Sequence, residues 1–181
     1  MTRDRCAVDW YTSIFELIDM RSFSNLWFWI ALAVVWSSAS HWVLGVPFDV
    51  VLRARRAGGQ AEADMNDIAR VHVNRLLYIV DVAGPWLLAF VSFLLTGLAM
   101  LGFYYGIEFA QAVFLLGFPM TLVGLVQLRA ARRIRGEGMQ GEDLARSLAR
   151  CRLYTQIIGM VSIFFTALWG MYQNMSIGVL G

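Results

Sequence analysis

Four apolar stretches, each long enough to cross a membrane, constrain the fold of this 181-residue chain more than any other feature. A helix takes about 20 residues to cross the roughly 30 Å hydrocarbon core of a bilayer. The stretches cover residues 26–46, 82–101, 109–128 and 153–172. Backbone inside lipid must satisfy its own hydrogen bonds, which a helix does. The sequence therefore predicts an all-α, integral membrane four-helix bundle that forms a single domain over residues 1–181.

The composition excludes the water-soluble alternatives. Hydrophobic residues make up 59% of the chain and charged residues 15%, against roughly 45–50% and about 25% in soluble domains. Too few polar side chains remain to cover a water-exposed surface. The chain has two Cys, too few for a disulfide-stabilised scaffold, and it is too apolar to be disordered.

The distribution of arginine predicts the orientation. All 15 basic residues are Arg, and twelve of them lie in two long connections, five in residues 49–75 and seven in residues 129–152. The short connection at residues 102–108 contains none. Because basic loops stay in the cytoplasm, both long connections are predicted to be cytoplasmic. Four spans then place both termini in the periplasm of a bacterium, with the chain in the inner membrane.

Residues 9–19 carry apolar side chains on one helical face and polar side chains on the other. This pattern predicts an N-terminal amphipathic helix that lies in the membrane interface. The alternative interpretation is a docking strip for a partner at the periplasmic surface.

Each predicted span supplies one polar side chain near its cytoplasmic end: His41, Asp81, Gln127 and Gln156. Polar groups are costly in lipid, which makes these four candidates for a site that binds a proton, an ion or a lipid head group. A proton or ion pathway would bring His41 and Asp81 together. The alternative is a polar packing core that needs no ligand.

A cluster of arginines follows the third span. Arg129, Arg132, Arg133 and Arg135 are candidates for binding anionic lipid or an acidic surface of a partner, although the orientation rule alone would also explain them. Nucleic-acid binding is not expected, because no fold that reads bases accompanies the charge. The sequence contains no catalytic motif and no Cys/His cluster at metal-ligand spacing, so no catalytic residue, metal or cofactor is predicted.

The string R-V-H-V-N at residues 70–74 resembles the glutathione-binding motif of the MAPEG family, four-helix membrane transferases and eicosanoid synthases with outer N-termini. The resemblance implies that Arg70, His72 and Asn74 contact glutathione. In the family a Glu follows the Asn by three residues, whereas Leu77 occupies that position here. The alternative is that the three side chains are solvated positions on a loop helix.

Three longer segments carry a second resemblance. They are DWYTSIFELIDMRSFSNLWFW (residues 9–29), SHWVLGVPFDVVLRARR (residues 40–56) and FAQAVFLLGFP (residues 109–119). These segments resemble a family of small alphaproteobacterial inner-membrane proteins labelled as a component of the SufBCD iron–sulfur assembly complex. The resemblance implies a protein partner and brings no catalytic motif with it.

These observations give three hypotheses for function. The first is a non-enzymatic accessory or interaction protein of the inner membrane, linked to a larger membrane complex or to iron–sulfur assembly. The second is a MAPEG-like membrane glutathione transferase, and the third is a small proton or ion pathway through His41 and Asp81. Membrane lipids and either a protein partner or a second copy of the chain are the expected partners.

Overall fold

The computed structural model describes residue 23 and residues 26–178. About 91% of the described residues are helical, so the all-α prediction is confirmed. The predicted amphipathic helix at residues 9–19 lies outside the described residues. In chain order the elements are α2 (Leu26–His41), β1 (Trp42–Val43), β2 (Val46–Pro47), α3 (Phe48–Ala57), α4 (Gly59–Ala99), the π-helical turn η2 (Met100–Tyr104), α5 (Glu108–Glu137) and α6 (Gly141–Gly178).

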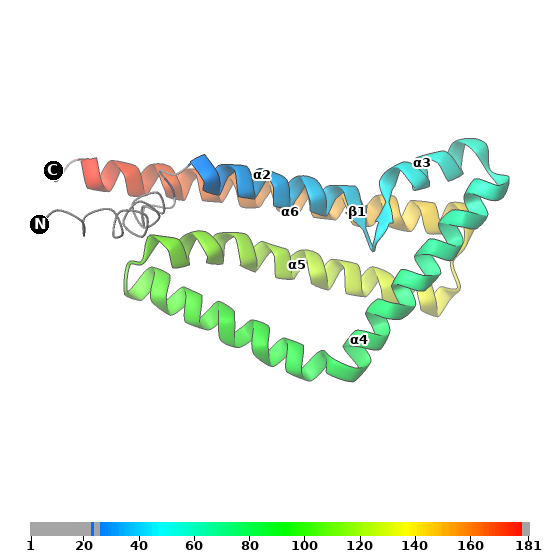
Figure 1. Ribbon diagram of the computed structural model, residues 1–181, viewed down its shortest axis with the longest axis horizontal. Coiled ribbons are helices and arrows are strands. Elements are labelled where there is room, and N and C mark those ends of the chain that lie inside the picture. Colours follow the sequence, from blue (N-terminus) through cyan, green and yellow to red (C-terminus); the bar gives the residue numbers. More distant parts are fainter. Residues whose placement is uncertain (1–22, 24–25, 179–181) are drawn as a thin grey trace, which may run out of the picture.

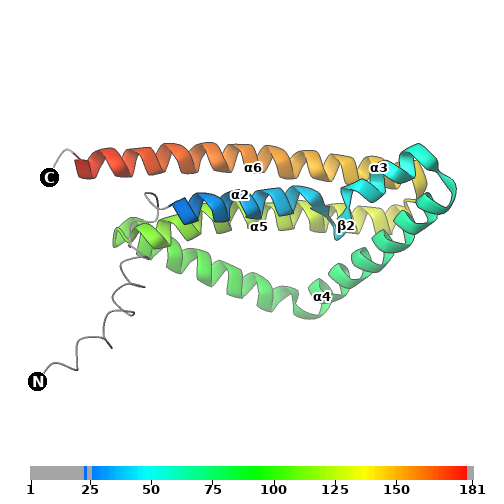
Figure 2. The ribbon, with the colours of Figure 1, turned by 45° about the horizontal axis from the view of Figure 1, so that its top comes forward.

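Three of the described helices are long and apolar enough to cross a membrane: α4 continued by η2, α5 and α6. They contain the predicted spans at residues 82–101, 109–128 and 153–172. Helix α2 is apolar but has 16 residues, a length of about 24 Å at 1.5 Å per residue. It lies along α6 (Figures 1 and 2). Its buried Leu32 and Trp36 pack together with Val123 of α5.

Helix α2 ends at His41, five residues before the expected end of the first span, because the chain turns back in a short hairpin. Strands β1 and β2 are antiparallel, and Val43 pairs with Val46. Between them, Leu44 and Gly45 have φ angles of 51° and 73°. Positive φ at both turn positions is the geometry that favours tight hairpins. Because Pro47 disfavours helical backbone at Val46, a helix does not resume until α3.

The two connections that were predicted as basic loops fold together into a helical head. We define the head as α3 with residues 59–80 of α4, residues 129–137 of α5 and residues 141–152 of α6, which gather at one end of the molecule (Figure 1). Its core is the largest cluster of buried apolar side chains among the described residues. Helix α4 contributes one stripe to this core, at i, i+4 spacing: Met65, Ala69, Val73 and Leu77. This spacing buries one face of a helix and exposes the other.

Polar contacts link the start of α6 to the other helices of the head. The side-chain oxygen of Asn66 accepts a hydrogen bond from the backbone N–H of Gly141 at 3.0 Å. Arg55 of α3 forms an ion pair with Glu142 at 3.3 Å. The Arg152 guanidinium lies 3.9 Å from the centre of the Phe48 ring, within the range of a cation–π interaction.

Helix α4 bends in its middle (Figures 1 and 2). Pro85 lies inside the helix, where it cannot donate to the carbonyl of Asp81, and such a residue is a common cause of a kink. Beyond the bend α4 is poorly covered, because only 6% of its most apolar stretch is buried. Trp86 and Phe93 are 80% and 75% exposed. In a membrane these side chains would face lipid or another protein.

Alanine substitutions of Gly45 and Gly138 test how tightly the hairpin turn packs on α4. A Cβ built on Gly45 would lie 2.6 Å from Cγ of His72, whereas one built on Gly138 meets nothing within 4 Å. Both glycines have positive φ. Gly138→Ala should therefore cost about 1 kcal/mol for the left-handed backbone alone. Gly45→Ala should cost about 1–3 kcal/mol more, because it overpacks the site.

The measurement is the thermal unfolding midpoint in detergent. Adding His72→Ala should remove most of the extra loss caused by Gly45→Ala and should leave the effect of Gly138→Ala unchanged. Equal losses for the two single alanine variants would show that the turn does not press on His72.

The rate at which Cys151 reacts with a thiol reagent tests the packing of the head. Cys151 belongs to the head core and is 2% exposed, so a thiol reagent should reach it only when the head opens. In a Cys6→Ser background, the native protein in detergent should react with a maleimide at least a hundredfold more slowly than the denatured chain. Fast labelling of the native protein would contradict the packed head.

Candidate functional site

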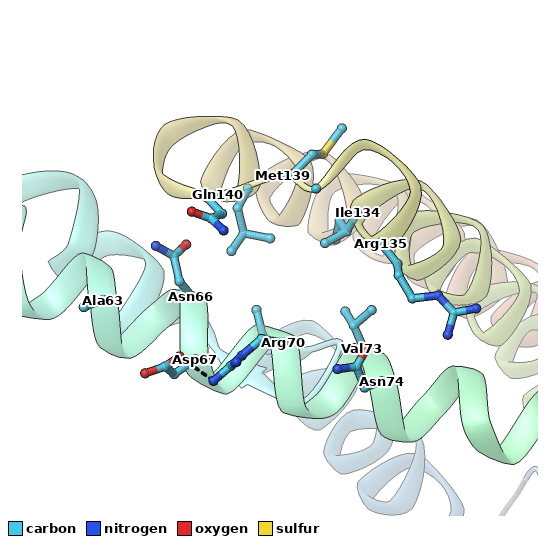
Figure 3. A pocket seen from close by; sticks show the side chains of 13 residues that line it. Ala63, Asn66, Asp67, Arg70, Val73, Asn74, Ile134, Arg135, Met139 and Gln140 are labelled. Carbon is cyan, nitrogen blue, oxygen red and sulfur yellow. Dashed lines mark hydrogen bonds and ion pairs between the residues drawn. The ribbon is translucent and has the colours of Figure 1, made fainter.

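One hollow of the head lies between α4 and the α5–α6 turn (Figure 3). We call it the α4–α5 hollow, and its volume is about 540 Å³. Val73, Ile134 and Leu144 line it and are buried in the head core. The other lining side chains are mostly polar and include Asn66, Asp67, Arg70, Asn74, Arg135 and Gln140. Ligand sites commonly combine an apolar lining with polar groups that can orient a ligand.

A second hollow lies under the hairpin turn. We call it the hairpin hollow, and its volume is about 300 Å³. Its polar lining consists of His72 and Arg75 from α4 with Gln127 from α5, and the turn residues Leu44 and Gly45 also line it. The close approach of Gly45 to the His72 ring places the imidazole against the turn.

The structure divides the R-V-H-V-N string between the two hollows. Positions i and i+4 of a helix lie on one face, whereas i+2 points to nearly the opposite side. Accordingly, Arg70 and Asn74 line the α4–α5 hollow, and His72 lines the hairpin hollow. Arg70 also forms an ion pair with Asp67 at 3.0 Å. The three residues of the glutathione-type motif therefore do not share one hollow.

The four polar residues predicted near the ends of the spans have separate surroundings. Asp81 forms an ion pair with Arg135 of α5 at 3.8 Å. The His41 ring contacts that of Trp42, edge to face, with 5.8 Å between the ring centres. Gln127 lines the hairpin hollow, and Gln156 is half-buried on α6. The ion-pair partner of Asp81 is thus one of the clustered arginines.

The arginines at the end of α5 are all exposed but are not equivalent. Arg133 forms an ion pair with Glu137 at 2.9 Å, and Arg135 lines the α4–α5 hollow as well as contacting Asp81. Arg129 and Arg132 form no ion pair within the part of the chain that the structure describes. Two guanidinium groups of this cluster therefore have no acidic partner there.

The sequence analysis missed a buried polar network at the opposite end of the bundle, centred on Gln111. This side chain is 3% exposed. Its amide nitrogen donates to the carbonyl of Gly102 in η2 at 2.8 Å. Its oxygen accepts from the Trp169 indole N–H at 2.9 Å and from the Gln173 amide at 2.7 Å. The available signal was a glutamine inside an apolar span, which is costly unless it is hydrogen-bonded.

Similarity to known proteins adds no further evidence on these sites. Comparison of the chain found no matching family model, no matching curated protein and no matching solved structure. The resemblances carried by residues 70–74 and by the three longer segments therefore stay predictions. Within residue 23 and residues 26–178, no three His, Cys, Asp or Glu side chains lie together as potential metal ligands.

The contact between Asp81 and Arg135 can be measured with a double-mutant cycle. Both side chains are more than half exposed, at 63% and 53%, and exposed ion pairs are worth about 0.2–1 kcal/mol. Asp81→Asn and Arg135→Gln should therefore show a coupling within that range in the free energy of unfolding. The coupling should shrink as salt is added, because exposed charges are screened.

The same cycle with Asp81→Asn and Arg133→Gln is the matched control and should give no coupling, since Arg133 has Glu137 as its partner. A coupling of Asp81 with His41 instead of Arg135 would contradict the arrangement described above.

Proposed function

We propose that this chain is a non-enzymatic accessory protein of a bacterial inner membrane, whose helical head binds a protein partner on the cytoplasmic side. In this proposal α2 and the three long helices are the four membrane spans. Membrane association is supported by the length and apolar character of α4 with η2, α5 and α6.

The orientation is supported by the arginines. The head contains most of the chain's basic residues, and the turn at the other end of α4 and α5 contains none. By the positive-inside rule this distribution favours a cytoplasmic head. The four-span arrangement is supported by α2, which packs on α5 and α6 through Leu32 and Trp36.

The observation that carries the proposal is the position of the larger of the two buried apolar clusters among the described residues. The core lies in the head, which all three long helices build together with α3. A protein that only needed to occupy a bilayer would not need a packed unit outside the apolar spans. Such a unit can instead hold surface side chains at fixed positions for a partner.

The surface best suited to a partner is the exposed end of α5. Arg129 and Arg132 lie one helical turn apart, and both are exposed. Arginines that lack an internal partner favour an acidic surface on the partner. The resemblance to proteins labelled as components of an iron–sulfur assembly complex suggests such a complex as that partner.

Reporter fusions test the orientation. A reporter that is active only in the periplasm should be active after Tyr105 and after Gly181, and inactive after Gly58 and after Gly138. The reason is that the positive-inside rule places the head, which contains Gly58 and Gly138, in the cytoplasm. Periplasmic activity after Gly138 would overturn the orientation.

Purification from native membranes tests the partner. The full chain should retain a second protein at a fixed stoichiometry in mild detergent. Arg129→Gln with Arg132→Gln should reduce that protein at least fivefold, because each charged contact contributes about 1 kcal/mol or more. The matched control is Arg53→Gln with Arg56→Gln, which removes the same charge from exposed positions of α3. A chain that purifies alone, or equal losses for both double variants, would contradict the proposal.

A further inference from the structure

The geometry of the α4–α5 hollow points to a second role, which does not depend on the proposed protein partner. We propose that this hollow binds the phosphodiester head group of an anionic glycerophospholipid.

Two guanidinium groups, Arg70 and Arg135, and one carboxylate, Asp67, line the hollow. Asp81, which pairs with Arg135, lies outside the lining. The neutral polar groups are the amides of Asn66, Asn74 and Gln140. Amide N–H groups can donate to phosphate oxygens, and an amide can also accept from the hydroxyl groups of a glycerol head group.

Both arginines keep donors available for a ligand. Each has an acidic neighbour, Asp67 at 3.0 Å and Asp81 at 3.8 Å. These pairs are more than half exposed, so they are weak. A guanidinium has five N–H donors in a planar fork that matches phosphate oxygens, so each arginine can keep its acidic neighbour and still bind an anion. Figure 3 shows Arg135 extending from α5 toward α4 beside the hollow.

A continuous ridge of α4 leads from the hollow to the apolar segment. Arg70 and Asn74 line the hollow, and the next positions at i+4 spacing are Tyr78 and Val82, which are 69% and 64% exposed. Along the ridge, the side chains thus change from a charged one to an amide, then to an aromatic ring and then to an aliphatic group. This change takes place within about 18 Å of helix, at 1.5 Å per residue. This order matches a phospholipid, whose charged head group is followed by an interfacial region and then by acyl chains.

The predicted membrane boundary lies next to the hollow, as binding of a lipid head group requires. Asp81 immediately precedes the predicted span at residues 82–101, and its ion-pair partner Arg135 lines the hollow. The side of the hollow next to Arg135 is therefore at the level of the head groups. A soluble phosphate ester offers the same charge but would gain nothing from the exposed ridge beyond Asn74.

Lipid binding to the full chain in neutral detergent tests the proposal. Native mass spectrometry with short-chain phosphatidylglycerol should show one saturable site, filled at least tenfold more tightly than with short-chain phosphatidylcholine or with glycerol 3-phosphate. Arg135→Gln should weaken the phosphatidylglycerol site at least tenfold, because it removes a charge-assisted hydrogen bond. Asn74→Asp should weaken it as strongly, because it adds a like charge beside the phosphate at nearly constant volume.

The matched control is Arg132→Gln, which removes an exposed arginine of the same helix that does not line the hollow. It should change the affinity less than twofold. The labelling rate of Cys151 in each variant shows whether the head is intact. Equal weakening by Arg132→Gln and Arg135→Gln in intact heads would overturn the site in favour of general attraction between arginines and lipid. Equal affinity for glycerol 3-phosphate would overturn the lipid assignment.

Discussion

For the membrane arrangement that we propose, the governing constraint is that lipid provides no hydrophobic driving force between helices. Lipid tails are as apolar as leucine, so apolar helices do not gain by leaving lipid for one another. Accordingly, α4 beyond its bend is almost uncovered, with 6% of its most apolar stretch buried. Besides the packing of α2 on α5 and α6, contacts at its two ends hold the chain together. At one end is the head core, which can form by the hydrophobic effect because it lies beyond the apolar segments, and at the other is the Gln111 network.

Two backbone carbonyls that the helices leave unsatisfied are hydrogen-bonded by side chains. Pro119 cannot donate to the carbonyl of Leu115, and the Ser162 hydroxyl of α6 donates to that oxygen at 3.4 Å. The carbonyl of Gly102, in the π-helical turn, accepts from Gln111 in the same way. A free carbonyl in lipid costs several kcal/mol. Polar side chains in these spans therefore contribute to helix pairing, and a polar residue inside a span is not by itself evidence of a ligand.

The long apolar stretches predicted the all-α class, and three of them lie within the three long apolar helices. Gly58 and Gly138 lie at the C-terminal ends of α3 and α5. The hairpin could not be predicted, because Leu44 adopts positive φ without a residue type that favours it. The surroundings of the polar residues also required the structure. Spacing gives the face of one helix but not the rotation of its neighbour, so it could not pair Asp81 with Arg135 or place Gln127 beside His72.

The bend in α4 connects its apolar half to the head. Because Pro85 turns the helix, residues 59–80 run at an angle to the apolar half of the same helix (Figure 1). The inner face of these residues closes the head core through Met65, Ala69 and Val73, while Arg70 and Asn74 border the α4–α5 hollow. One rigid segment thus contributes both to the head that would contact a protein and to the hollow that would contact a lipid. A ligand that binds in the hollow more tightly at one bend angle than at another must shift the orientation of the head toward that angle. A protein partner that binds one orientation of the head must then change the affinity of the hollow for that ligand by the same factor as the ligand changes the affinity for the partner.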